Sequence, residues 1–289
     1  MLHLLLFFLT FITCTVFGFA LLQSFSTHQG LNLDFIGEGY ARLARGDGSV
    51  FSGMCFSVPL LVILLAHEFG HYIACQRWGV QASLPYFLPS PTLLGTLGAF
   101  IRIRSPIYTR SSLFDIGASG PIAGFIVLIP FLIFGIHWSR EIPGIGVRGD
   151  MVFGTPLLLR LAEVLQFPGV PAADISLHPV AVAAWAGLVA TATNLLPVGQ
   201  LDGGHILYSV LGDRWHRISS NALVLVLVGV GFVYRPWWLL AVLLFLFGRR
   251  HPLVYDETPV NNRRRLVSVL TPAIFLLSVL VAPVEVHIR

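Results

Sequence analysis

Residues 56–75 read FSVPLLVILLAHEFGHYIAC, and this stretch decides the class of fold. About 20 mostly apolar residues are enough to cross the hydrocarbon core of a bilayer as a helix. The second half of the stretch nevertheless contains His67, Glu68 and His71. Because ionisable groups inside a membrane helix are costly and rare, each of them is a candidate functional group. The stretch therefore predicts a membrane helix that carries a chemical site.

The composition of the whole chain agrees with a membrane protein. Hydrophobic residues make up 55% of the 289 residues and charged residues only 11%, whereas soluble domains contain about 25% charged residues. This excludes a soluble enzyme, a disordered chain and a DNA-binding domain. All 18 basic residues are arginines that lie between apolar runs, so we expect no nucleic-acid partner and a lipid bilayer around the protein.

Six more apolar segments follow the same pattern, which predicts an all-α polytopic membrane protein with about seven transmembrane helices. The first segment is read as a retained anchor, with a cleaved signal peptide as the alternative, because it has no basic region before it. The break at Arg235–Pro236 splits one long apolar run into two short helices. The segments are residues 2–22, 116–138, 179–196, 218–234, 237–248 and 266–281.

The arginines predict the orientation of these helices. One set of alternate loops holds 11 of the 18 arginines, and the richer side belongs in the cytoplasm by the positive-inside rule. We therefore expect the N-terminus and the site at His67 on the cytoplasmic side. The chain contains no lysine, which suggests a high-GC coding sequence, so the expected location is a bacterial inner membrane, in a multi-pass arrangement.

Two segments between the helices are predicted to be non-helical. Residues 93–104 alternate in a period of two, which is typical of a strand, and Gly95 and Gly98 predict a turn. A small membrane-associated strand or sheet is therefore expected between the second and third helices. Residues 139–178 are expected to form a loop. The predicted organisation is an N-terminal anchor and loop (1–53), a core (54–212) and C-terminal transmembrane helices (213–289).

The three ionisable residues of the opening stretch have the spacing of a metal site. His67 and His71 are four residues apart, so both imidazoles project from one helical face and can bind one metal. Glu68 can take a proton from a water near that metal. A hydrolytic zinc site usually has a third protein ligand, and Asp202 in NLLPVGQLDGGHIL is the candidate. Its alternative role is to cap the helix that begins near His205.

Two further polar residues have alternative interpretations. Asn194 lies on an apolar segment, where its amide could stabilise a developing oxyanion or simply join two helices by a hydrogen bond. His205 follows Asp202 by three residues. It is either a supporting group behind the metal ligands, or a donor to the transition state, or an ordinary histidine at a helix end.

The motifs HEFGH (67–71), GPIAG (120–124) and NLLP…LDGG (194–204) together resemble the site-2 protease family of intramembrane zinc metalloproteases, peptidase family M50. GTLGAFIRIRSP (95–106) and FGRRHP (247–252) are most similar to its branch related to the plastid EGY proteins and their bacterial members, without a PDZ domain. The resemblance implies one Zn²⁺ ion, held by His67, His71 and Asp202, with Glu68 as general base and Asn194 stabilising the intermediate. It also implies that the strand near 98–104 holds unwound substrate, through Gly98, Phe100 and Arg102.

The predicted function is therefore hydrolysis of peptide bonds within or near the transmembrane segment of a single-span membrane protein. Two alternatives belong to other classes: a zinc-binding holdase for membrane proteins, and a transporter driven by metal ions or protons. Glu68 argues against the holdase, which has no need of a general base. The transporter is disfavoured because the chain has no second copy of the His/Glu cluster. The sequence leaves the natural substrate and the oligomeric state open.

Overall fold

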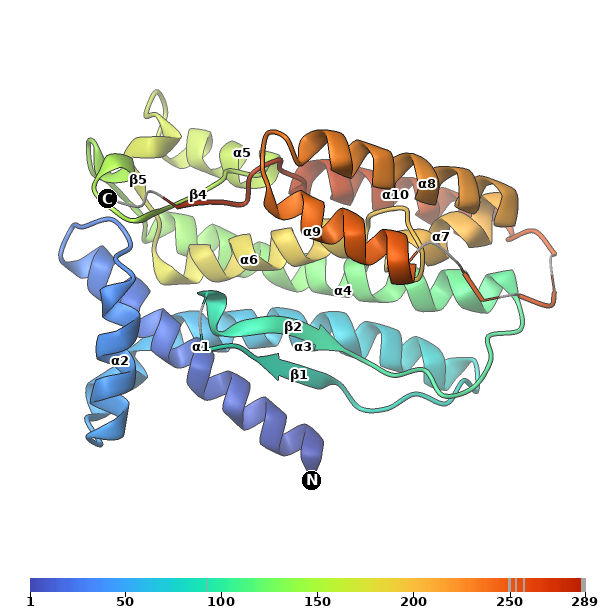
Figure 1. The fold of residues 1–289 in the computed structure, drawn as a ribbon, viewed down its shortest axis with the longest axis horizontal. Helices are drawn as coiled ribbons and strands as arrows, with labels where there is room; N and C mark the ends of the chain where they lie inside the picture. Colours follow the sequence, from blue (N-terminus) through green and yellow to red (C-terminus); the bar gives the residue numbers. More distant parts are fainter. Residues whose placement is uncertain (92, 249–250, 253, 257, 287–289) are drawn as a thin grey trace.

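The computed structural model describes residues 1–91, 93–248, 251–252, 254–256 and 258–286. In these ranges the chain forms an elongated helical bundle with short strand pairs beside it and at one end (Figure 1). The α-helices are α1 (Leu2–Ser26), α2 (Asp34–Ala44), α3 (Met54–Arg77), α4 (Arg110–His137), α5 (Leu157–Gln166), α6 (Pro179–Asn194), α7 (Asp202–Leu211), α8 (Asp213–Val230), α9 (Pro236–Leu243) and α10 (Asn262–Ser278). The strands are β1 (Tyr86–Pro89), β2 (Thr96–Phe100), β3 (Arg140–Glu141), β4 (Met151–Phe153), β5 (Ile175–Ser176) and β6 (Val284–Val286).

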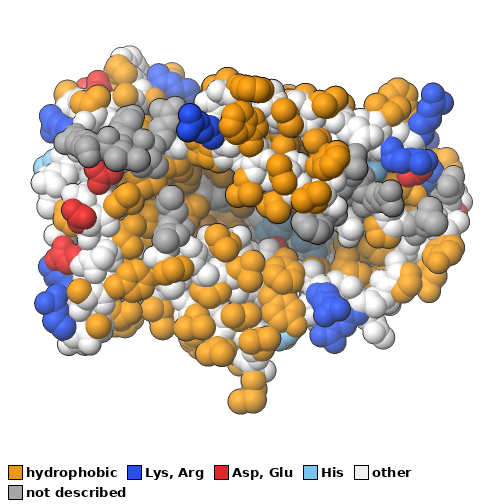
Figure 2. Space-filling model, in the orientation of Figure 1, with side chains coloured by type: hydrophobic (Ala, Val, Ile, Leu, Met, Phe, Trp, Pro, Cys, Tyr) orange, Lys and Arg blue, Asp and Glu red, His pale blue; other side chains and the backbone are white. Residues whose placement is uncertain are grey.

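Three helical segments are long and apolar enough to cross a membrane: α1, Gly48–Arg77 (which contains α3) and α4. Figure 2 shows apolar side chains over much of the visible face, with most of its charged side chains towards the two ends of the long axis. A bundle whose middle faces lipid and whose ends face water has this distribution. The mostly helical fold and the membrane-type helices agree with the prediction.

The other predicted spans correspond to shorter helices. α6 has 16 residues, α8 has 18 with three charged residues among its first five, α9 has eight and α10 has 17. At 1.5 Å per residue, a 16-residue helix is about 24 Å long, which is less than the roughly 30 Å of a hydrocarbon core. Apolar composition therefore predicts more full-length spans than the helix lengths support. Arg249, Arg250 and Arg289, which contributed to the predicted orientation, lie outside the described residues.

The centre of the bundle is formed by α3, α4 and α6, which pack against one another. Four alanines of α6 are 4% exposed or less, and such small side chains let neighbouring helices approach closely. Trp185, also on α6, is buried, and its indole Nε1 donates a hydrogen bond to the Gly154 carbonyl at 2.7 Å. α6 is therefore packed closely against its neighbours, and the Trp185 hydrogen bond also ties it to the segment that follows β4. The alanines are Ala181, Ala183, Ala184 and Ala186.

The predicted sheet between α3 and α4 is the antiparallel hairpin β1–β2. Its tip contacts α1, where the Thr13 hydroxyl donates to the Gly95 carbonyl at 2.6 Å. The predicted continuation of the strand to Arg104 is found only in part, because β2 ends at Phe100. Beyond that residue the Ser83 hydroxyl accepts the bond from the Arg102 N–H at 2.9 Å. Backbone pairing then continues only as an isolated antiparallel bridge between Ala82 and Ile103.

Residues 139–178 contain more structure than the predicted loop. They include α5, and β3 pairs with β5. β4 pairs with β6 near the C-terminus, so two more two-stranded sheets lie at the end of the bundle opposite to Arg77 (Figure 1). The all-α description is therefore incomplete. Strands of two or three residues are too short to produce a detectable period of two in the sequence.

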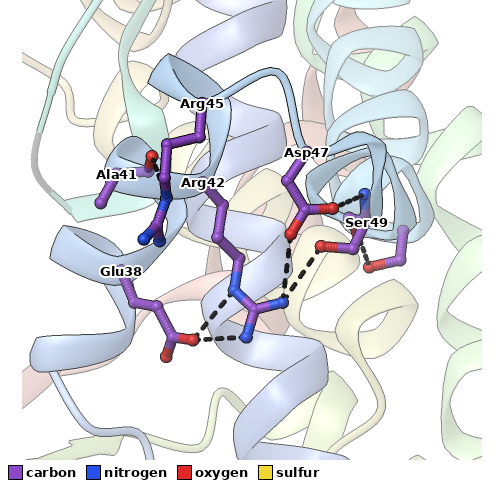
Figure 3. Close-up of polar contacts among 7 residues, drawn as sticks. Glu38, Ala41, Arg42, Arg45, Asp47 and Ser49 are labelled. Atoms are coloured by element: carbon purple, nitrogen blue, oxygen red, sulfur yellow. Dashed lines mark hydrogen bonds and ion pairs between the residues drawn. The ribbon is translucent and has the colours of Figure 1, made fainter.

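α2 is tied to the beginning of α3 by a small polar network (Figure 3). Arg42 Nε donates to the Glu38 carboxylate at 2.9 Å, and its Nη1 lies 3.4 Å from the Asp47 carboxylate. The other Asp47 oxygen accepts from the Ser49 N–H at 2.9 Å, and the hydrogen bonds with Ser49 lower the pKa of Asp47. These contacts hold the turn that leads into α3. They lie outside the apolar part of that helix.

Candidate metal centre

Two helices supply the three side chains of the centre. His67 and His71 lie one helical turn apart on α3, where they are 5% and 7% exposed. Asp202 is the first residue of α7, after the stretch 195–201 that contains Pro197. The α7 N-cap is Leu201, which makes no side-chain capping bond. The Asp202 carboxylate lies against the two imidazoles.

The potential ligand atoms of the three side chains lie close to one another. Nε2 of His67 lies 3.1 Å from Nε2 of His71, and an oxygen of Asp202 lies 3.2 and 3.3 Å from these two nitrogens. Ligand atoms at the corners of a tetrahedron around zinc, with bonds of about 2.0–2.1 Å, lie roughly 3.3 Å apart. Two imidazoles and one carboxylate are also a ligand set that zinc uses in hydrolytic enzymes. The three residues therefore fit a zinc ion.

The backbone of α4 orients one of the ligands. The Ile116 carbonyl lies 2.7 Å from Nδ1 of His71. Because a carbonyl only accepts, Nδ1 must carry the proton and donate it. The neutral ring then has its lone pair on Nε2, the atom that faces His67 and Asp202. A hydrogen bond of this kind is what fixes the tautomer of metal-binding histidines.

The GPIAG motif of α4 leaves room for both imidazoles. A Cβ atom on Gly120 would overlap the ring of His71, and one on Gly124 would lie 3.1 Å from the His67 Cβ. A side chain at Gly120 would displace the His71 ring, and one at Gly124 would crowd His67. This gives a physical reason for the two glycines of the motif.

We expect Gly120→Ala to weaken zinc binding about 10- to 100-fold, the range seen when groups that orient metal ligands are disturbed. The added methyl would force the His71 ring to leave the Ile116 carbonyl. Competition with a chelator of known affinity measures the change. Gly37→Ala is the matched control, because a Cβ there has no neighbour within 4 Å. Equal zinc affinity in both variants would contradict this explanation of the motif.

Glu68 and Asn194 lie on the wall of a cavity of about 220 Å³ that the three ligands also line. Glu68 is 5% exposed, and the backbone N–H of Ile101, just after β2, faces its carboxylate. Asn194 is the last residue of α6, and its amide nitrogen lies 3.3 Å from Nε2 of His67. The cavity thus combines a metal-type ligand set, a carboxylate and an amide donor. In Figure 2, histidine and acidic atoms are visible in a hollow of the apolar face.

The predicted substrate-holding residues are brought only partly to this cavity. Phe100 lines it, together with the neighbouring Ala99 and Ile101. Gly98 and Arg102 are not among the residues that line it in the described part of the chain. Arg102 instead pairs through its backbone with Ser83. The end of β2 therefore reaches the cavity, and so does Ile103 beyond it, while the Arg102 side chain between Ile101 and Ile103 does not line it.

His205 lines the same cavity, and its Nδ1 lies 2.7 Å from Nε2 of His251. Sequence reasoning did not identify His251, the Ile116 carbonyl or the Ile101 N–H. A backbone group has no signature in a sequence. For His251 the available signal was FGRRHP, the motif that contains it.

Comparison with known proteins agrees with the metal centre described above. The model of the family described as Peptidase family M50 matches residues 55–235. A protein of Arabidopsis thaliana named probable zinc metalloprotease EGY1, chloroplastic, is 33% identical over 223 residues, which are 73% of this chain and 40% of that protein. The rice protein of the same name is 32% identical over 242 residues, 80% of this chain and 41% of the relative. The chain thus spans about two fifths of the length of these relatives.

The relatives correct the predicted location. They carry the word chloroplastic in their names, and this finding overturns the prediction of a bacterial inner membrane. That prediction depended on the absence of lysine, which reports on codon composition and carries no information about the compartment.

The same comparison supports the predicted zinc cofactor and the predicted family. The named zinc metalloproteases, together with the group formed by His67, His71 and Asp202, bear out the predicted zinc cofactor. The family model covers more than half of the chain and contains all three of these residues. The predicted family is confirmed: the chain belongs to peptidase family M50.

Proposed function

We propose that this chain is a zinc-dependent endopeptidase that hydrolyses peptide bonds within or near the transmembrane segment of single-span membrane proteins. One observation carries the proposal: a ligand set of two buried histidines and the half-buried Asp202, together with a carboxylate, lines one cavity inside an apolar helical bundle. The family match supports the reaction class. The names of the relatives support a plastid membrane as the location.

His67, His71 and Asp202 would hold the metal, and Glu68 would move the proton. Bound zinc supplies Lewis-acid chemistry, which activates water and polarises a carbonyl. Glu68 takes the proton of the attacking water as a general base and then delivers it to the leaving amine as a general acid. The Asn194 amide donates a hydrogen bond to the oxygen that gains negative charge at the scissile carbonyl. Burial of Glu68 excludes competing bulk water from this transfer.

The end of β2 is proposed to hold the substrate. A peptide inside a membrane is helical, with its carbonyls bonded internally, so it must unwind before it can be attacked. An exposed strand edge offers replacement backbone hydrogen bonds by strand addition. β2 pairs only with β1 among the described strands, and its last residues lie beside Glu68. Gly98, Phe100 and Arg102 would then follow the unwound segment, with Phe100 nearest the cavity.

The proposed membrane arrangement adds α6, α8, α9 and α10 to the three long helical segments, which makes seven segments. The core would be residues 54–212, between an N-terminal anchor with its loop (1–53) and the C-terminal helices (213–289). α3 ends at Arg77 and α4 begins at Arg110, so the metal centre lies nearer to an arginine-bearing end of the bundle. Water would enter the cavity from that side.

The proposal is tested with purified protein in liposomes that also contain a panel of single-span test proteins. The expected result is a cut inside or next to the apolar segment of at least one panel member, located by mass spectrometry. A cut that lies only in the soluble part of the substrates would contradict the proposal. Protection of the test proteins from aggregation without any cut, by protein that holds its zinc, would favour a holdase instead.

A further inference from the structure

A pair of hydrogen-bonded histidines joins the cavity to the segment before α10. His205 belongs to α7, and its Nδ1 lies 2.7 Å from Nε2 of His251. The His251 ring stacks on Tyr208, with 4.4 Å between the ring centres and 24° between the ring planes. Tyr208 is 1% exposed. His251 is thus held by Tyr208 in contact with His205, the residue that lines the cavity.

The positions of the protons in this pair follow from one carbonyl and from the neutral state of His251. Nδ1 of His251 lies 2.6 Å from the Pro252 carbonyl, which can only accept, so Nδ1 carries a proton. Burial lowers the pKa of His251 to about 4, so the ring is neutral at pH 7. Its Nε2 is then an acceptor, and Nδ1 of His205 must donate to it. Neutral His205 therefore has a bare lone pair on Nε2.

The bare nitrogen is not one of the fully buried side-chain atoms that lack a partner in the described part of the chain, so it retains some exposure. His205 lines the cavity that contains Glu68 and Asn194. Among the described residues, no hydrogen bond to Nε2 of His205 is found, whereas its Nδ1 is engaged. An acceptor at this place matches what an unwound peptide offers, because such a peptide has backbone N–H groups that have lost their helical partners.

We propose that His251 is a positioning residue, which holds His205 in its Nδ1–H tautomer so that Nε2 accepts a hydrogen bond from a backbone N–H of the peptide substrate. The inference rests on the proposed protease function for its substrate. The other tautomer would place an N–H against the peptide N–H, and both donors would lose a partner. The hydrogen bond between His205 and His251 excludes that arrangement.

The tautomer is measured without any cleavage, by nitrogen NMR of the full chain labelled at histidine. We expect the Nδ1–H form for His205, identified by its absence from His205→Gln. His216 is the internal reference, because its Nε2 lies 2.9 Å from the Gly199 carbonyl and must give the opposite form. In His251→Phe, which keeps an aromatic ring against Tyr208, the preference of His205 is expected to vanish. An Nε2–H signal from His205 in the wild type, or an unchanged His205 signal in His251→Phe, would overturn the proposal.

The effect on the reaction is measured with three variants at equal zinc content. His251→Phe removes the acceptor and is expected to lower kcat/KM about tenfold, the usual effect of one lost hydrogen bond. His251→Gln supplies an amide oxygen in place of Nε2 and is expected to stay within about threefold of wild type. His137→Gln, at the exposed far end of α4, is the matched control. Equal losses in the Phe and Gln variants would contradict the proposal.

The partner on the substrate is identified by N-methylation, one backbone nitrogen at a time. At one position the methyl group is expected to slow cleavage by wild-type protein about tenfold more than cleavage by His205→Phe. The absence of such a position would contradict the role of the acceptor. If no substrate is cut at all, the proposed function fails, and the NMR result still decides whether His251 sets the tautomer.

Discussion

Asp202→Ala is expected to remove both the metal and the activity. The variant leaves His67 and His71 as the only ligands of the group, and a hydrolytic zinc site usually needs three from the protein. Zinc content should fall from about one ion per chain to near none, and cleavage should fall below detection. Metal analysis of the purified protein and a cleavage assay on the same sample measure the two effects.

Asp213→Ala is the matched control for this experiment. Asp213 is also the first residue of a helix, but its carboxylate pairs with Arg217 on the surface. We expect wild-type zinc content and activity from it. Retention of about one tightly bound zinc ion by Asp202→Ala would show that another residue supplies the third ligand.

Glu68→Gln is expected to slow the reaction without removing the zinc ion. Glutamine has nearly the shape of glutamate, so the packing around α3 should hold, but its amide cannot accept the proton of a water molecule. General acid–base catalysis contributes about 10²- to 10⁴-fold, and kcat should fall by this amount. Zinc content should stay at about one ion per chain, because Glu68 does not belong to the ligand group.

The matched control is Glu141→Gln. Glu141 lies in β3 at the far end of the bundle and is exposed. Its replacement should change neither zinc content nor cleavage. Equal activity of Glu68→Gln and wild-type protein would remove Glu68 from the mechanism, and loss of zinc from the variant would contradict the separation of Glu68 from the ligand group.

The metal centre could be inferred from the sequence because its chemistry is local. A spacing of four on a helix places His67 and His71 on one face, whatever the rest of the fold does. Asp202 was harder, because an aspartate at a helix start is also a good N-cap. The structure has Leu201 at the N-cap and the Asp202 carboxylate beside the two imidazoles.

The small sheets and the strand end could not be inferred in the same way. β3 and β5 have two residues each, and a period of two needs a longer segment to be visible. The alternation of residues 93–104 continues past Phe100, yet the regular strand ends there and the pairing goes on only as a single bridge between Ala82 and Ile103. The residue pattern of β2 does not show which hydrogen-bonding groups the facing segment presents to it.

The supporting groups depend on contacts between distant segments. The Ile116 carbonyl, which orients His71, belongs to a backbone that is the same for every residue type. Gly120 and Gly124 were visible as parts of a motif, but their purpose required the positions of both imidazoles. His251 lies 46 residues from His205 in the sequence, and only the fold brings the two rings together.

Removal and restoration of zinc test the central claim most directly. Purified protein in liposomes is stripped with a chelator, assayed on a single-span substrate that it cuts, and then titrated with zinc. We predict that cleavage disappears with the metal and returns in full at about one zinc ion per chain, with the cut in the apolar segment of the substrate. Cleavage that continues at the same rate in zinc-free protein would contradict the account.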